Sequence, residues 1–173
     1  MRLDIAGRWG RSFRPLLNLT ITDGIGVTLM RLENESGYIE YDFKTDLNEE
    51  EGERYLPAFY QGSVIELKMI EASQKGGGRH LMTAFFELAT IRKAKLVFLD
   101  CCPLFMDGQE TEIMQRLHDF YTNFGFTGRS GNGYSRLWRI QVLPDSLDAC
   151  FTNGYDKEND LHPVLLRAFQ SAR

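Results

Sequence analysis

The sequence predicts an α/β (α+β) protein with a mixed, mostly antiparallel central sheet, folded as a single domain over residues 1–173. Three observations support this class. The chain has 173 residues, 43% of them hydrophobic, which is enough for one domain with a core. Strand-like runs with hairpin character fill its N-terminal part. One strand, glycine-rich turn, helix and strand unit follows them, so antiparallel pairs and one crossover are both expected.

Four strands are expected in the first part of the chain. The runs LLNLTIT (16–22) and GVTLMRLE (26–33) lie on either side of an Asp-Gly pair, a strong hairpin signal, so they should pair antiparallel. The run YIEYDFK (38–44) alternates apolar and acidic residues, which indicates a third strand with one buried face. The run VIELKMI (64–70) is the expected fourth strand.

The second part of the chain mixes helices and strands. After a glycine run, apolar residues recur with helical spacing up to about Arg92. The run KLVFLD (95–100) is nearly all apolar, as a strand buried between helices is. A second helix is expected from about Glu110 to the Gly125–Phe126 pair. Two further elements complete the order: a strand at SRLWRIQVL (135–143) and an amphipathic helix in the C-terminal segment 144–173.

Composition narrows the classes of function. A net charge of −4 argues against nucleic acid as a partner, because such affinity comes largely from Lys and Arg neutralising phosphates. Three cysteines form neither a disulfide framework nor a metal-binding spacing, so a cytoplasmic protein without a metal is expected. Cys101 and Cys102 end a buried strand and are expected in the core or at its rim. No apolar run reaches the length of a membrane span, and no signal peptide is recognised.

The segment SQKGGGRHLM (73–82) places three consecutive glycines (76–78) directly before a helix. Backbone N–H groups at a helix start are unpaired and carry the positive end of the helix dipole, so they bind phosphates readily. Lys75 and Arg79 flank these amides and add positive charge. The stretch therefore predicts a pyrophosphate site. The alternative is a tight turn that needs glycine for its backbone alone.

Two other classes of phosphate site fit this segment less well. A P-loop requires G-x-x-x-x-G-K-[ST], which does not occur. A dinucleotide fingerprint finds its first two glycines at Gly76 and Gly78 but has Leu81 at the third. Asp100, at the end of the next strand, keeps a Rossmann-like nucleotide-binding protein open as an alternative, since it could hold a ribose. The antiparallel strands upstream disfavour that fold.

Two motifs together resemble the GNAT superfamily of acyl-CoA-dependent N-acetyltransferases. The segment SQKGGGRHLM is similar to that family's pyrophosphate loop, and FYTNFGF (120–126) is similar to its F-Y-x-x-x-G-F motif. The order of helix, strand and helix between them also matches. Two positions differ from the family pattern. Ser73 stands where the family has Arg or Gln, so that Gln74 or Lys75 would supply the contact, and Met114 stands where it has Asn.

The resemblance implies a GNAT fold, in which the strands at 64–70 and 95–100 splay apart and helices cover both faces of the sheet. The cofactor would be acetyl-CoA, the acetyl thioester of coenzyme A, bound by a core at 64–126. An amine would attack the thioester directly, with transfer helped by positioning. The residues that the resemblance assigns to the cofactor are Lys68, Met69, Ile70, Gln74, Lys75, Gly76, Gly77, Gly78, Arg79, His80 and Tyr121.

The resemblance also assigns catalytic side chains. Tyr121 aligns with the family's tyrosine acid for the leaving sulfur, and its alternative is an aromatic on the apolar stripe of the helix. Glu66 lies where some members place the general base, and its alternative is a salt bridge with Lys68. His118, one turn before Tyr121, could relay protons, and its alternative is a surface histidine.

The acceptor is an amine that the sequence leaves open between a small molecule and a protein or peptide. The acidic stretch at 46–53 would suit a cationic amine or a lysine-rich peptide. A homodimer is also left open. A different class of function remains beside the enzyme: a GNAT-like module that senses acyl-CoA or binds a protein without turnover.

Overall fold

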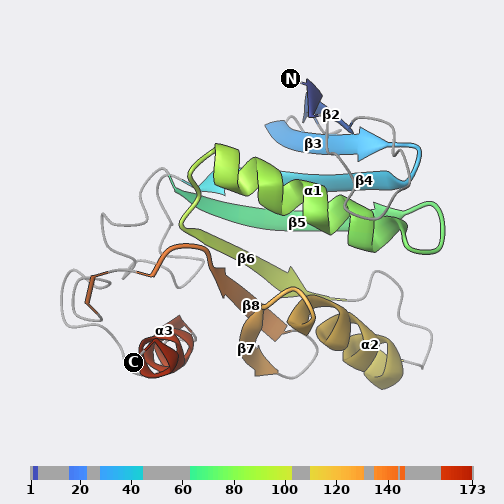
Figure 1. Cartoon of the computed structure of the whole chain (residues 1–173). Coiled ribbons are helices and arrows are strands. Elements are labelled where there is room, and N and C mark those ends of the chain that lie inside the picture. Colours follow the sequence, from blue (N-terminus) through green and yellow to red (C-terminus); the bar gives the residue numbers. More distant parts are fainter. Residues whose placement is uncertain are drawn as a thin grey trace. The chain divides into compact units, whose positions relative to one another are not determined.

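The computed structural model describes residues 2–3, 16–22, 28–44, 63–102, 110–130, 135–143, 145–146 and 161–172. These residues form eight strands and three helices (Figure 1). In chain order they are β1 (Arg2–Leu3), β2 (Leu16–Thr22), β3 (Thr28–Asn34), β4 (Gly37–Lys44), β5 (Val64–Ala72), α1 (Gly77–Ile91), β6 (Leu96–Cys101), α2 (Glu110–Thr122), β7 (Thr127–Ser130), β8 (Ser135–Ile140) and α3 (Leu161–Ser171). The predicted class, an α/β protein with a mostly antiparallel sheet, is confirmed.

The chain groups into two compact units. The first unit comprises Met1–Asp42 and Glu66–Lys93, and the second comprises Phe43–Ile65 and Ala94–Arg173. The single domain and the splay of two strands stay predictions. Among the described helices, none has both the length and the apolar composition that crossing a bilayer requires.

In the first unit the strand order is β1-β2-β3-β4-β5. The predicted pairing of the first two runs is confirmed, because β2 and β3 are antiparallel with Thr22 opposite Thr28. The Asp-Gly turn between them lies outside the described residues. The predicted alternation of buried and polar residues in β4 is also found, since Ile39 and Tyr41 are fully buried. Tyr41 donates its hydroxyl proton to Asn18 Oδ1 at 2.8 Å, which satisfies two polar groups inside this core.

Helix α1 covers the sheet of the first unit (Figure 1). Its buried face consists of Gly77, Leu81, Met82, Ala84, Phe85, Leu88 and Ala89, which recur with the spacing of one helix face. The ring of Phe85 meets that of Tyr41 edge-on, with centroids 5.6 Å apart. The helix ends one residue before the predicted Arg92, and Lys93 adopts a left-handed φ of 56° just beyond it.

In the second unit the strand order is β6-β8-β7, and both pairs are antiparallel. Phe98 lies opposite Trp138, with ring centroids 5.1 Å apart. Asp100 lies opposite Arg136, which donates two hydrogen bonds to its carboxylate at 2.7 and 2.8 Å. The sequence did not predict β7, because its four residues, TGRS, contain one β-branched residue and no large apolar one.

Helix α2 ends just before Gly125, as the sequence predicts. Gly125 has a left-handed φ of 81°, and the N–H groups of Phe124 and Phe126 both donate to the carbonyl of Tyr121. Phe126 is fully buried beside Tyr121, with ring centroids 5.8 Å apart. The C-terminal turn therefore fixes Tyr121 in place. The last predicted helix is also present, as α3, with Val164 and Leu165 buried.

Candidate functional site

The glycine loop connects β5 to α1 in the first unit, and its last residue, Gly76, is the N-cap of the helix. Gly76 has φ 86° and ψ −11°, a left-handed conformation that glycine adopts at little cost. Apart from its two chain neighbours, no residue that the structure describes has an atom within 4 Å of the position that a Cβ atom on Gly76 would take. No side chain among the described residues caps the helix start. The first turn therefore has no side-chain cap among these residues, and the Gln74 carbonyl accepts the Gly77 N–H at 3.0 Å. A helix start without a side-chain cap is suited to an anion.

Gly77 serves the packing of the loop. It is buried, and a Cβ atom on it would lie 2.6 Å from the carbonyl oxygen of Ser36. Such a contact is too short for any side chain, so the close approach of the β3–β4 turn requires glycine here. Gly78, the second residue of α1, is half-buried. The three glycines thus have different surroundings.

The β3–β4 turn holds this loop by hydrogen bonds. The N–H of Ser73 donates to the Ser36 carbonyl at 2.9 Å, and Gln74 Nε2 donates to Ser36 Oγ at 3.2 Å. Ser36 is fully buried, and its own N–H donates to Asn34 Oδ1 at 2.8 Å. No sequence pattern indicated a role for Ser36 or Asn34. Asn and Gly in the segment NESG are turn residues, but nothing local shows that the turn contacts the loop.

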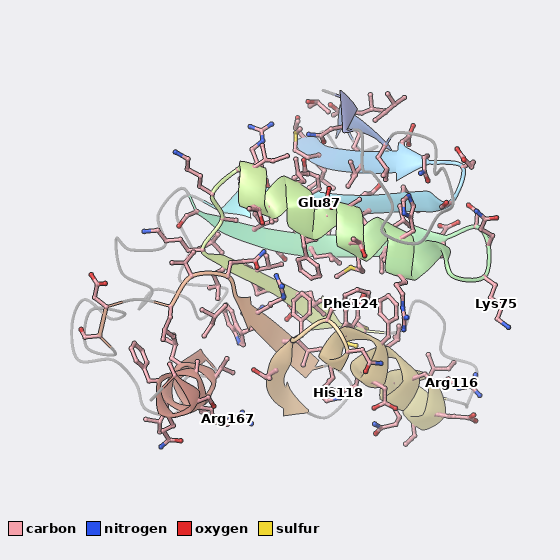
Figure 2. All side chains as sticks on the ribbon, viewed as in Figure 1. Lys75, Glu87, Arg116, His118, Phe124 and Arg167 are labelled. Carbon is pink, nitrogen blue, oxygen red and sulfur yellow. The ribbon has the colours of Figure 1, made fainter. Side chains whose placement is uncertain are left out.

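Two exposed cations flank the helix start. Lys75 and Arg79 both lie at the surface, and Figure 2 shows Lys75 extending away from the loop. His80, one residue after Arg79, is half-buried, and its Nε2 atom lies 3.3 Å from Asn34 Nδ2. Burial lowers the pKa of His80, while Glu35 partly opposes that shift. His80 is therefore neutral at pH 7, and Lys75 and Arg79 supply the positive charge.

Glu66 and Lys68, two residues apart on β5, form an ion pair. Lys68 Nζ lies 2.6 Å from Glu66 Oε1, so the salt bridge that the sequence left open is present. Glu66 is 8% exposed, whereas Lys68 is exposed. Farther along β5, Met69 and Ile70 are half-buried, and the Tyr38 hydroxyl lies 3.4 Å from Met69 Sδ.

Tyr121 lies in the second unit, on the buried side of α2. Only 6% of the residue is exposed, and its ring contacts those of Phe120 and Phe126 edge-on. Burial raises the pKa of the Tyr121 phenol well above its usual range, and the neighbouring Cys101 adds to the shift. Its hydroxyl makes no hydrogen bond to the residues that the structure describes. Tyr121 therefore carries its proton at any physiological pH, as a general acid must.

The remaining candidates are in the second unit. Burial raises the pKa of the Cys101 thiol to about 11, with a smaller contribution from Cys102, so Cys101 is a neutral thiol rather than a nucleophile. Cys102 is exposed. His118 is half-buried on α2 (Figure 2), with Nδ1 3.4 Å from Thr122 Oγ1. Asp100, which kept the Rossmann-like alternative open, has both carboxylate oxygens bonded to Arg136, which disfavours a ribose contact.

The glycine loop, Glu66 and Lys68 thus lie in the first unit, and Tyr121, Cys101 and His118 lie in the second. The acidic stretch at 46–53 lies outside the described residues. Within the described part of the chain, no group of three or more His, Cys, Asp or Glu side chains could hold a metal ion.

Comparison with known proteins gives a likeness to solved structures. No protein-family model and no curated protein matches the chain. The chain is similar to Ard1 from Thermoplasma volcanium, with 18% identity, a TM-score of 0.41 and coverage of 67% of this chain and 71% of that one. It is also similar to an acetyltransferase from Bacillus cereus, with 12% identity, a TM-score of 0.34 and coverage of 71% and 69%.

Proposed function

We propose that this chain is an N-acetyltransferase that transfers the acetyl group of acetyl-CoA to an amine. The observation that carries the proposal is the start of α1, where Gly76 is left-handed, no described side chain caps the helix, and the described residues beyond its chain neighbours leave the Cβ position of Gly76 open. Such a site suits the pyrophosphate of coenzyme A, because several N–H donors and the helix dipole converge on one anion. The two motifs that resemble the GNAT superfamily support the same function.

The residues of the glycine loop fit the pyrophosphate of coenzyme A. A side chain at position 76 would occupy the space that a phosphate needs, and the chain has glycine there. The exposed Lys75 and Arg79 add charge-assisted contacts to the phosphate oxygens. The neighbouring His80 is neutral, so the cationic side chains of this segment are the lysine and the arginine.

The bound cofactor would supply an acetyl group activated as a thioester. The acceptor amine would have to be held next to the thioester carbonyl carbon, which it attacks in its neutral form, and the thiolate of coenzyme A then leaves. The proton lost by the amine goes to a base, and the sulfur takes one from an acid. We assign the acid to Tyr121, whose buried phenol stays protonated.

Glu66 is the proposed base, directly or through water. Its carboxylate is engaged by Lys68, so proton uptake requires that this ion pair loosen or that water carry the proton. The acceptor is an amine on a small molecule or on a peptide, and the reaction is proposed to take place in the cytoplasm.

A second function is favoured by this same ion pair. A module that binds acyl-CoA without turnover needs the glycine loop but no free base. The carboxylate of Glu66, the proposed base, is ion-paired with Lys68. Met114, half-buried on α2 where the resembled family has Asn, also fits a site that has lost a polar contact.

A thiol-release assay separates the two functions. The protein is incubated with acetyl-CoA and a panel of amines: polyamines, small primary amines, peptide N-termini and lysine-containing peptides. The proposed enzyme releases coenzyme A with at least one amine, above the rate without protein. Binding of acetyl-CoA with no release on any amine would favour the sensing module.

A further inference from the structure

We propose that Ser36 is a positioning residue for the glycine loop, with Gln74 as the latch that joins the loop to it. This inference rests on the proposed function for its ligand, since the loop is taken to bind the pyrophosphate of coenzyme A. It assigns Gln74 a different task from the one that the family resemblance implies: Gln74 holds the loop and does not contact the cofactor.

The first tie is made by the backbone of Ser36. Its carbonyl accepts the N–H of Ser73 at 2.9 Å, just after β5 ends. The same oxygen lies 2.6 Å from the Cβ position of Gly77, so the start of α1 is pressed against it. One buried carbonyl thus contacts both ends of the loop.

The second tie is made by the side chain of Ser36. Its hydroxyl accepts from Gln74 Nε2 at 3.2 Å, and the carbonyl of Gln74 accepts the N–H of Gly77 at 3.0 Å. Gln74 therefore bridges the β3–β4 turn and the first residue of α1. Since Ser36 is fully buried, its hydroxyl has little access to water in place of this partner.

The turn that carries Ser36 is itself fixed. Asn34 Oδ1 accepts the N–H of Ser36 at 2.8 Å, and Asn34 Nδ2 lies 3.3 Å from His80 Nε2 on the first turn of α1. Gly37 has φ 128°, and a Cβ atom on it would lie 2.0 Å from the carbonyl oxygen of Glu71 in β5. The β3–β4 turn therefore packs tightly on the strand that precedes the loop and is tied to the helix that follows it.

These ties explain how the loop keeps its shape. The left-handed Gly76 lies between Gln74 and Gly77 in the sequence, so fixing these two residues restricts the conformations that Gly76 can adopt. A preformed loop loses less conformational entropy when it binds an anion, which raises affinity without changing the chemical step. Loss of the latch should weaken acetyl-CoA binding and leave turnover at saturation unchanged.

A double-mutant cycle tests the latch. Acetyl-CoA affinity is measured by calorimetry for Ser36→Ala, Gln74→Leu and the double variant, and kcat is measured alongside. Each single change should weaken binding by roughly 3- to 10-fold, the range for one neutral hydrogen bond. The double variant should be no weaker than either single one, because both remove the same contact. Thr90→Ala, which removes an exposed hydroxyl bonded to the Phe86 carbonyl near the far end of α1, is the matched control.

Amide hydrogen exchange without ligand provides an independent measurement. The N–H groups of Gly77 and His80, bonded to the Gln74 and Gly76 carbonyls, should exchange faster in both single variants than in the wild type. Gln74 is exposed, so Gln74→Leu keeps the fold even if Ser36→Ala unfolds the protein.

Three results would overturn the proposal. Additive losses of affinity would show that Gln74 contacts the ligand independently of Ser36. Unchanged acetyl-CoA affinity in both single variants would exclude the latch. Unchanged amide hydrogen exchange at Gly77 and His80 would also exclude it. If the wild type binds no acetyl-CoA, the proposed function fails, while faster exchange in the variants still supports the positioning of the loop by Ser36.

Discussion

The carbonyl oxygen of Ser36 lies 2.6 Å from the position that a Cβ atom on Gly77 would occupy, although the two residues are far apart in the sequence. Contact of this kind allows no side chain at position 77 without movement of the β3–β4 turn or of α1.

Gly77→Ala should therefore destabilise the protein, by roughly 1–3 kcal/mol, as overpacking of a close-packed site does. Gly76→Ala is the matched comparison, because no described residue beyond its chain neighbours lies within 4 Å of its Cβ position and the cost there comes from the left-handed backbone, about 1–2 kcal/mol. Urea unfolding of both variants measures these free energies. A Gly77→Ala variant as stable as the wild type would show that Ser36 does not pack on the helix start.

Gly78→Val should abolish acetyl-CoA binding while the fold is kept. A β-branched side chain beside the first-turn amides obstructs the approach of a phosphate, whereas the buried face of α1 is unchanged. Calorimetric titration with acetyl-CoA gives the affinity, and circular dichroism checks the fold. Wild-type affinity in this variant would remove the loop from the cofactor site.

The pH dependence of stability should report His80. Its pKa is lowered by burial in the folded protein, so the unfolded chain binds the proton more readily, with an ordinary pKa near 6.5. The stability that His80 contributes is therefore complete above about pH 6.5 and declines as the pH falls towards the lowered, folded pKa.

Replacing His80 by Gln removes this titration. Urea midpoints of the wild type should fall between about pH 7 and pH 5, and those of His80→Gln should fall less over the same range. Parallel curves for the two proteins would show that His80 titrates equally in the folded and unfolded states.

Two tyrosines allow a matched test of the proposed acid. Tyr121→Phe should lower kcat by roughly 10²- to 10⁴-fold, the range for general acid catalysis, with acetyl-CoA affinity unchanged. Its hydroxyl has no hydrogen-bond partner among the described residues, so stability should change little. Tyr41→Phe should do the reverse and lose roughly 1 kcal/mol of stability with full activity, because Tyr41 bonds the buried Asn18. Full turnover in Tyr121→Phe would exclude the acid role.

Local patterns predicted most of the elements. Alternation in YIEYDFK gave the buried face of β4, and helical spacing after the glycines gave the extent of α1 to within one residue. The ion pair of Glu66 with Lys68 was also anticipated, because residues two apart in a strand share a face. β7 was missed because its composition carries no strand signal.

The contacts of the glycine loop could not be predicted in this way. Ser36 meets Ser73, Gln74 and Gly77 only because β4 and β5 are neighbours in the sheet, and a single sequence does not record that long-range contact. The sequence identified glycine as necessary, whereas the structure distinguishes the conformational need at Gly76 from the packing need at Gly77.

Thermal unfolding with and without acetyl-CoA tests the central claim, that α1 begins at a coenzyme A site, most directly. Wild-type protein should gain stability as RT ln(1 + [L]/Kd), about 2.7 kcal/mol at a hundredfold excess over Kd, and NADH should give no shift. The Gly78→Val variant should show no shift with either compound. Stabilisation of the wild type by NADH and not by acetyl-CoA would contradict the account and restore the Rossmann-like alternative.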